Sequence, residues 1–168
     1  MFDTLQNFAE VGVAIAGFSG IASAVSARSL QEWTPVERDH LIGLLETSGL
    51  VVVFALVPQV LLQLVEEAHA LWVVSSLLYL VVHVLHYGIT GRKMLRSISA
   101  GRGDAIRLRT VFAMGAVATI LLVSQATAIL FGTTAQLKFI YLVILLWHTA
   151  IAGAMFADLL TRSVARHK

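Results

Sequence analysis

Five long apolar stretches run through this 168-residue chain, at residues 8–27, 40–64, 70–90, 110–132 and 138–161. A helix needs about 20 predominantly apolar residues to cross the ~30 Å hydrocarbon core of a bilayer, and each stretch is long enough. The apolar runs are continuous rather than alternating, and an open sheet edge would leave backbone groups unpaired in lipid. Each stretch therefore predicts a transmembrane helix.

The composition agrees with a membrane protein. Hydrophobic residues make up 58% and charged residues 13% of the chain, and the mean hydropathy is +0.83. The absence of cysteine excludes disulfides, thiolate metal sites and a cysteine nucleophile. Met1-Phe2-Asp3 lacks the basic region of a cleavable signal, so we expect the first stretch to remain in the mature protein. We predict an all-α polytopic membrane protein whose residues 1–168 form a single transmembrane domain with five transmembrane helices.

The basic residues orient these five spans. Eleven of the twelve Lys and Arg residues fall on one side of the membrane in the five-span arrangement, and only Lys138 falls on the other. The positive-inside rule then places the N-terminus outside and the C-terminus in the cytoplasm, in a cell membrane that we expect to be the bacterial inner membrane. The third connection is the most basic, and we expect it to contact anionic headgroups through Arg92, Lys93, Arg96, Arg102, Arg107 and Arg109. No aromatic interleaving or known module indicates nucleic-acid binding.

The start of the second helix carries a capping signal. Thr34-Pro35-Val36-Glu37 combines the capping-box pattern with proline at the first helical position. This pattern predicts a helix that begins at Pro35, several residues before the apolar stretch itself.

The first stretch is rich in small residues, which account for twelve of the twenty positions from Phe8 to Ala27. One seam of small side chains lets another helix backbone approach closely, and we assign it to helix packing through Gly12, Ala16, Gly20 and Ser23. A second stripe begins with an acid and ends with a base. In a ring of several copies it would line a pore through Glu10, Ala14, Gly17, Ile21, Ala24 and Arg28, although charges at helix ends also simply reach for headgroups.

Polar residues of the third stretch share one face of the helix, within an arc of about 120°. That face must turn toward protein or water, because lipid would leave its polar groups unpaired. Comparable depths predict an inner polar layer of Glu46, His86 and Asp158, to which Tyr79 and His83 add further intramembrane polar groups, and an outer layer of Gln59, Gln63 and Gln125 with Glu10. Glu46 is the strongest functional candidate, and a Glu46–His86 hydrogen bond that only sets helix register is the alternative.

These features favour an ion-conducting homo-oligomer that passes cations or protons rather than anions. A chain this small cannot enclose a pathway alone, and an acidic outer ring concentrates cations. A membrane redox subunit that holds haem between His83 and His148 is the second hypothesis, because the two histidines lie at similar depths. An accessory subunit of a larger membrane complex is the third. No other cofactor and no metal site is indicated.

Gly17-Phe18-Ser19-Gly20 resembles the G-x-S-G element of rhomboid proteases. The resemblance implies an intramembrane serine hydrolase in which Ser19 is the nucleophile and His148 the base. It covers four residues, and the chain departs from the family in having five spans, the serine in the first span and no glycines of the family pattern after His148. Chance readily produces such a match in a helix rich in Gly, Ala and Ser, so enzymatic activity is the less favoured hypothesis.

Overall fold

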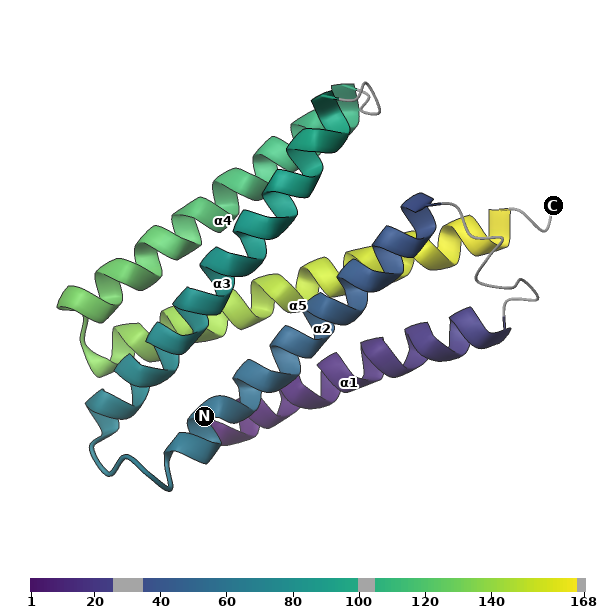
Figure 1. Ribbon diagram of the computed structural model, residues 1–168. Helices are drawn as coiled ribbons and strands as arrows, with labels where there is room; N and C mark the ends of the chain where they lie inside the picture. The colour runs from purple at the N-terminus through teal and green to yellow at the C-terminus, as the bar shows by residue number, and fades with distance from the viewer. Residues whose placement is uncertain (26–34, 100–104, 166–168) are drawn as a thin grey trace. The chain divides into compact units, whose positions relative to one another are not determined.

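The computed structural model is built, over the residues that it describes, from five helices (Figure 1). It describes the backbone of residues 1–25, 35–99 and 105–165 and the side chains of residues 1–21, 38–92, 109 and 112–161. The helices are α1 (Phe2–Val25), α2 (Pro35–Leu61), α3 (Ala68–Ser99), α4 (Ala105–Phe131) and α5 (Thr134–Ala165). These described ranges contain no strand, and the prediction of an all-α chain is confirmed.

Four of the helices are long and apolar enough to cross a membrane. Their apolar segments are Arg38–Leu61, Ala68–Arg92, Phe112–Phe131 and Thr134–Thr161. Over its described residues α1 is not among them, and its first turns carry the polar residues Asp3, Thr4, Gln6, Asn7 and Glu10. By length and composition a multi-pass membrane protein is confirmed for four helices, while the crossing by α1 and the orientation of the termini stay predictions.

Each helix covers most of its apolar stretch, but the bounds differ: α1 begins at Phe2 rather than at residue 8, and α3 continues to Ser99, beyond residue 90. α2 begins at Pro35, as the capping pattern predicts, but it ends at Leu61 rather than at residue 64. The next three residues form a turn closed by the bonds Gln63 N to Val60 O (3.2 Å) and Leu64 N to Leu61 O (2.9 Å). The predicted stretch extends three residues beyond the helix because hydropathy scores Leu62 and Leu64 as apolar although they lie in the turn.

The turn between α4 and α5 is short and well specified. Gly132 N donates to the Ala128 carbonyl (2.9 Å), and a Cβ at Gly132 would come within 2.5 Å of that same oxygen, so only glycine fits. Thr133 then caps α5 reciprocally with Gln136: Thr133 N donates to Gln136 Oε1 (2.8 Å) and Gln136 N donates to Thr133 Oγ1 (3.3 Å). This capping box starts α5 at Thr134, four residues before the predicted position 138.

The chain divides into two compact units whose boundary lies inside α5. The first unit consists of Met1–Leu64 and Leu142–Lys168, and the second unit consists of Val65–Tyr141. α5 therefore contributes its first residues to the second unit and the rest of its length to the first.

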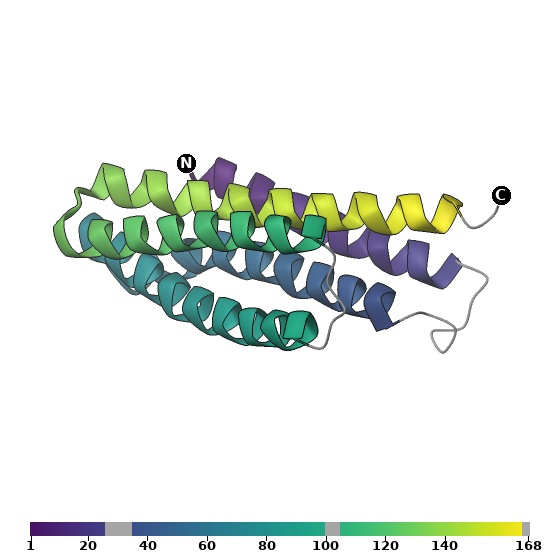
Figure 2. The ribbon, with the colours of Figure 1, turned by 90° about the horizontal axis from the view of Figure 1, so that it is seen from above.

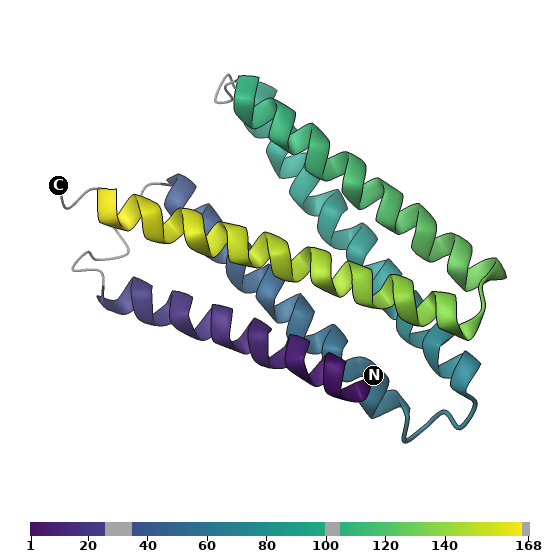
Figure 3. The same ribbon diagram turned by 180° about the vertical axis from the view of Figure 1, so that it is seen from behind.

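In the first unit α1 packs along α2 (Figure 1). The contact is closest at Gly12, where an added Cβ would lie 2.9 Å from Val52 Cγ2 and 3.2 Å from the Ser48 carbonyl oxygen. α5 joins α2 at Gly43, where an added Cβ would lie 2.8 Å from Met155 Cε. Figure 3 shows this part of α5 alongside α2. Small residues thus set the helix spacing here.

In the second unit α3 lies beside α4 (Figure 2). Buried Ala118, Gln125 and Ala128 mark the face that α4 turns inward. Gln125 Nε2 donates to the Ser76 carbonyl of α3 (2.9 Å), so a polar bond as well as packing links the two helices. At the first turn of α3, His69 Nδ1 lies 3.0 Å from Thr134 Oγ1 at the start of α5.

Candidate functional site

The polar face of α3 supplies most of the candidate site. The structure buries Ser75, Ser76, Tyr79 and His83, half-buries His86 and Tyr87, and leaves Thr90 exposed. These positions recur every three or four residues, so they share one side of the helix. The opposite side is exposed and aliphatic, with Leu77, Leu78, Val81, Val84 and Leu85.

Aromatic and imidazole rings on this face form a continuous series, which we name the ring column. The centroid distances are 5.6 Å for Trp72–Tyr141, 5.3 Å for Tyr141–Tyr79 and 5.9 Å for Tyr79–His83. The series continues with 4.6 Å for His83–Tyr87 and 5.6 Å for Tyr87–His86. The sequence had singled out Tyr79, His83 and His86, and the structure brings these three together within the second unit.

Lys138 lies at the Trp72 end of the ring column. Its Nζ is 5.7 Å from the centre of the Trp72 ring, within the range of a cation–π contact. Sequence reasoning had used Lys138 only for orientation. The signal for this contact was available, because an aromatic residue near the start of one span and a basic residue near the start of another often meet at the membrane interface.

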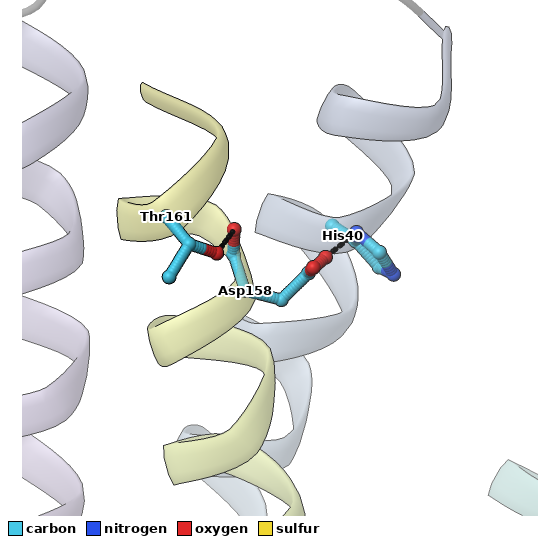
Figure 4. Close-up of polar contacts among 3 residues, drawn as sticks. All are labelled: His40, Asp158 and Thr161. Carbon is cyan, nitrogen blue, oxygen red and sulfur yellow. Dashed lines mark hydrogen bonds and ion pairs between the residues drawn. The ribbon is translucent and has the colours of Figure 1, made fainter. Parts of the chain in front are cut away.

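Asp158 of the predicted inner layer pairs with a residue that the sequence had not singled out. His40 Nδ1 of α2 lies 3.1 Å from Asp158 Oδ2 of α5, and Thr161 Oγ1 donates to the Asp158 backbone carbonyl (2.9 Å) (Figure 4). The two paired side chains are 29% and 37% exposed. His40 is the first residue of the predicted second span, so its depth is close to that of Asp158, but depth alone did not select this pair.

Glu46 is the other inner-layer residue of the first unit, and its side chain is exposed on α2. It lies on the outward face of that helix together with Ile42, Gly49, Val53, Leu56 and Val60, which are also exposed. A Cβ added at Gly49 would meet nothing within 4 Å. Glu46 is thus a carboxylate in the middle of an otherwise apolar outer face.

The residues of the predicted outer layer make separate contacts. Gln59 Nε2 donates to the Ala55 carbonyl of its own helix (3.4 Å), and Gln63 lies exposed in the turn after α2. Glu10 is exposed and accepts a bond from Gln6 Nε2 (3.1 Å). Gln125 is 1% exposed and bonds to α3 in the second unit. Gln59 and Glu10 therefore bond within their own helices, and Gln125 bonds to the neighbouring helix.

The predicted pore-lining stripe of α1 lies on the side of the helix turned away from α2. Its described members are exposed: Glu10, Ala14, Gly17 and Ile21. The side chain of Ala24 and the whole of Arg28 lie outside the described residues. This stripe is therefore accessible on a single chain.

The predicted packing seam of α1 meets α2 over part of its length. Gly12 is buried and Ala16 half-buried, whereas an added Cβ at Gly20 would meet nothing within 4 Å. The side chain of Ser23 lies outside the described residues. Close approach of α1 to α2 is centred on Gly12.

The histidine and serine of the enzymatic and haem hypotheses are deeply buried. Ser19 Oγ donates to the Ile15 carbonyl of its own helix (2.6 Å). His148 Nδ1 lies 2.9 Å from the Ile144 carbonyl, one turn back along α5. His148 belongs to the first unit and His83 to the second.

Of the basic cluster in the third connection, Arg92 and Arg109 are exposed. The side chains of Lys93, Arg96 and Arg107 and the whole of Arg102 lie outside the described residues. Among the described residues, no three His, Cys, Asp or Glu side chains lie close enough together to hold a metal ion.

The chain matches no protein-family model, no curated protein and no solved structure.

Proposed function

We propose that this protein crosses the bacterial inner membrane five times, with its N-terminus outside, and conducts small cations as a homo-oligomer. The observation that carries the proposal is the exposed carboxylate of Glu46. Glu46 lies eight residues after Arg38, where the apolar segment of α2 begins, so it is about 12 Å into the span.

A charged carboxylate at this depth is energetically unfavourable where it faces lipid. Placing a charged side chain at the centre of a membrane helix costs at least about 2.5 kcal/mol on insertion scales, and such residues face a protein interior or a water-filled path. A second copy packed over the outer face of α2 removes Glu46 from lipid and puts it beside a path between copies. Acidic side chains in such a path attract cations and repel anions.

The exposed stripe of α1 supplies a second acidic side chain, farther toward the outside. Glu10 is exposed near the start of α1, and the next residues along that stripe, Ala14 and Gly17, are small. In the proposed orientation Glu10 lies toward the outer mouth and Glu46 toward the cytoplasmic end. Because Gly12 packs against Ser48 and Val52 of α2, Glu10 lies about 9 Å farther toward the outside than Glu46, and a pathway between copies would carry these two acids at successive depths.

Orientation follows from charge. The one-sided distribution of Lys and Arg supports an outside N-terminus, which requires α1 to cross the membrane. Protease protection of a tag at each terminus in right-side-out and inverted vesicles tests this arrangement. Both tags on the same side would contradict five crossings.

Cation flux tests the proposed activity. Purified protein in liposomes should pass K⁺ or Na⁺ and exclude Cl⁻, and Glu46→Gln should lower the cation flux about tenfold, the change that ~1.4 kcal/mol of lost attraction produces. Glu10→Gln should lower it in the same direction. Glu66→Gln is the matched control, because Glu66 is an exposed carboxylate in the connection between α2 and α3.

Other outcomes of the same preparation would assign the alternatives. Monomeric protein with no flux would overturn the proposal, and a second polypeptide that co-purifies stoichiometrically would indicate an accessory subunit. One observation favours the haem hypothesis: His83 and His148 are almost completely buried in apolar spans. A Soret band in protein expressed with haem available would support it.

A further inference from the structure

The second unit holds titratable side chains that the cation path between copies does not use. Tyr79 and His83 of α3 and Tyr141 of α5 are almost completely buried. Hydrocarbon side chains would fill the same space without the desolvation that a phenol or an imidazole requires. Burial of these groups in membrane-spanning helices therefore points to a role for their polar atoms.

The ring column is continuous over most of a membrane crossing. Each ring lies between 4.6 and 5.9 Å from the next, measured between centroids, from Trp72 to His86. The column extends along α3 from Trp72 to Tyr87, which is about 22 Å at 1.5 Å per residue. The hydrocarbon core to be crossed is ~30 Å thick.

Apart from Trp72, whose indole only donates, the side chains in the column are ones that can pass a proton. A phenol and an imidazole each both donate and accept a hydrogen bond. Imidazole can accept a proton at one ring nitrogen and release another from the second, and its charge changes near neutral pH. His83 lies between Tyr79 and Tyr87, so the group best suited to exchange protons occupies the middle of the series.

Packing alone accounts for one end of the column better than for the other. Trp72, Tyr141 and Tyr79 meet edge to face, which is the usual geometry of stabilising aromatic contacts. Two imidazoles and a phenol follow toward the cytoplasmic end of α3, where aliphatic residues would pack at least as well.

A second observation points to bound water beside the column. Gln125 is buried, its Nε2 bonds to the Ser76 carbonyl, and within the described part of the chain its Oε1 has no hydrogen-bond partner. Ser76 lies one turn before Tyr79 on α3. A buried acceptor is normally satisfied by a water molecule when protein offers no donor.

We propose that the ring column, with water bound at Gln125, is a proton path inside each copy of the chain, separate from the cation path between copies. Protons pass along Tyr79, His83, Tyr87 and His86 by exchange, through bound water, between the hydroxyl and imidazole groups of successive rings, and no covalent bond to carbon changes. The ligand of this site is the proton itself, carried on side chains and water.

Proton flux into liposomes loaded with a pH-sensitive dye, driven by a K⁺ diffusion potential in the presence of valinomycin, tests the proposal. His83→Phe keeps a ring of similar size and removes both nitrogens, and it should lower proton flux about tenfold or more. Tyr87→Phe, which removes only the hydroxyl, should lower it by a smaller factor. His69→Phe is the control, because His69 is exposed and lies outside the column.

Two further measurements separate conduction from packing. Imidazole added to His83→Ala liposomes should restore proton flux, whereas a column that only packs would not respond. If His83→Phe does not fold, ¹⁵N NMR of the wild-type protein in lipid is measured instead. The signal of the His83 ring nitrogens should then show that the ring exchanges its proton with solvent.

The outcomes distinguish this inference from the proposed cation path. Proton flux that is unchanged in folded His83→Phe, or lowered equally in His69→Phe, overturns the ring-column path even when Glu46-dependent cation flux is present. Proton flux that depends on His83 in a protein without cation flux supports the ring-column path and overturns the cation path.

Discussion

The two units differ in where they leave their ionisable side chains. The first unit buries His148 but leaves the carboxylates of Glu10 and Glu46 exposed, and its helices approach one another closely at Gly12 and Gly43. The second unit buries Tyr79, Tyr141, His83 and Gln125, half-buries Tyr87 and His86, and leaves an aliphatic side of α3 exposed. In lipid the buried groups of the second unit need no cover from another molecule, whereas the exposed carboxylates of the first unit need a protein or water to shield them.

This difference indicates that the two units have different roles. An exposed ionisable group in a span indicates an interface with another protein molecule, and a buried series of titratable groups indicates a path or a polar core within the chain. The stability of each unit should accordingly depend on different contacts: close packing in the first unit, and hydrogen bonds and rings in the second.

The largest stability change is expected at Gly12. Gly12→Leu should lower the free energy of unfolding by about 1–3 kcal/mol, because even a Cβ would lie 2.9 Å from Val52 Cγ2 and 3.2 Å from a backbone oxygen. Unfolding in a titration with sodium dodecyl sulfate measures the change. Gly17→Leu is the matched control on the same helix, since an added Cβ there would meet nothing within 4 Å. Equal losses in the two variants would contradict close packing at Gly12.

A smaller change is expected at Gln125 in the second unit. Interhelical hydrogen bonds in membrane proteins contribute about 0.6 kcal/mol on average and up to about 1.7, so Gln125→Leu should lower stability within that range. Gln59→Leu should cost less, because Gln59 bonds only to its own helix. The same titration measures both variants. A greater loss at Gln59 than at Gln125 would show that the bond to Ser76 is not what links α3 to α4.

The smallest change is expected at the His40–Asp158 pair. Both side chains are substantially exposed, and exposed ion pairs typically contribute about 1 kcal/mol or less. His40→Ala should therefore lower stability by less than about 1 kcal/mol, and the difference should shrink as salt screens the pair. A double-mutant cycle with Asp158→Ala isolates the pair. A coupling energy well above this value would mean that the pair is buried in the assembled protein.

Much of the fold followed from hydropathy and local signals. The apolar stretches located the helices, Pro35 marked the start of α2, and the polar arc of α3 anticipated its buried side. The errors occurred at turns, where the backbone rather than side-chain hydropathy decides. Thr133 and Gln136 extend α5 toward its N-terminus by capping it, and the bonds after Leu61 end α2 early.

The candidate site was less accessible to sequence reasoning. Depth along a helix suggested that Glu46, His86 and Asp158 lie at one level, but depth does not state which helices are neighbours. Asp158 pairs with His40, and Glu46 lies on an outer face, because the packing of α1 and α5 decides which side of α2 is covered. The ring column likewise needed Tyr141 of α5, whose proximity to α3 no periodicity reveals.

Cysteine cross-linking in native membranes tests most directly whether a second copy covers the Glu46 face. The chain contains no cysteine, so a single introduced thiol reports its own surroundings. Gly49 is exposed about one turn from Glu46, and Ala55 of the same helix is fully buried. We predict that oxidation converts the Gly49→Cys variant to a disulfide-linked dimer and leaves Ala55→Cys monomeric. A Gly49→Cys variant that cross-links no more than Ala55→Cys would contradict an interface between copies at this face.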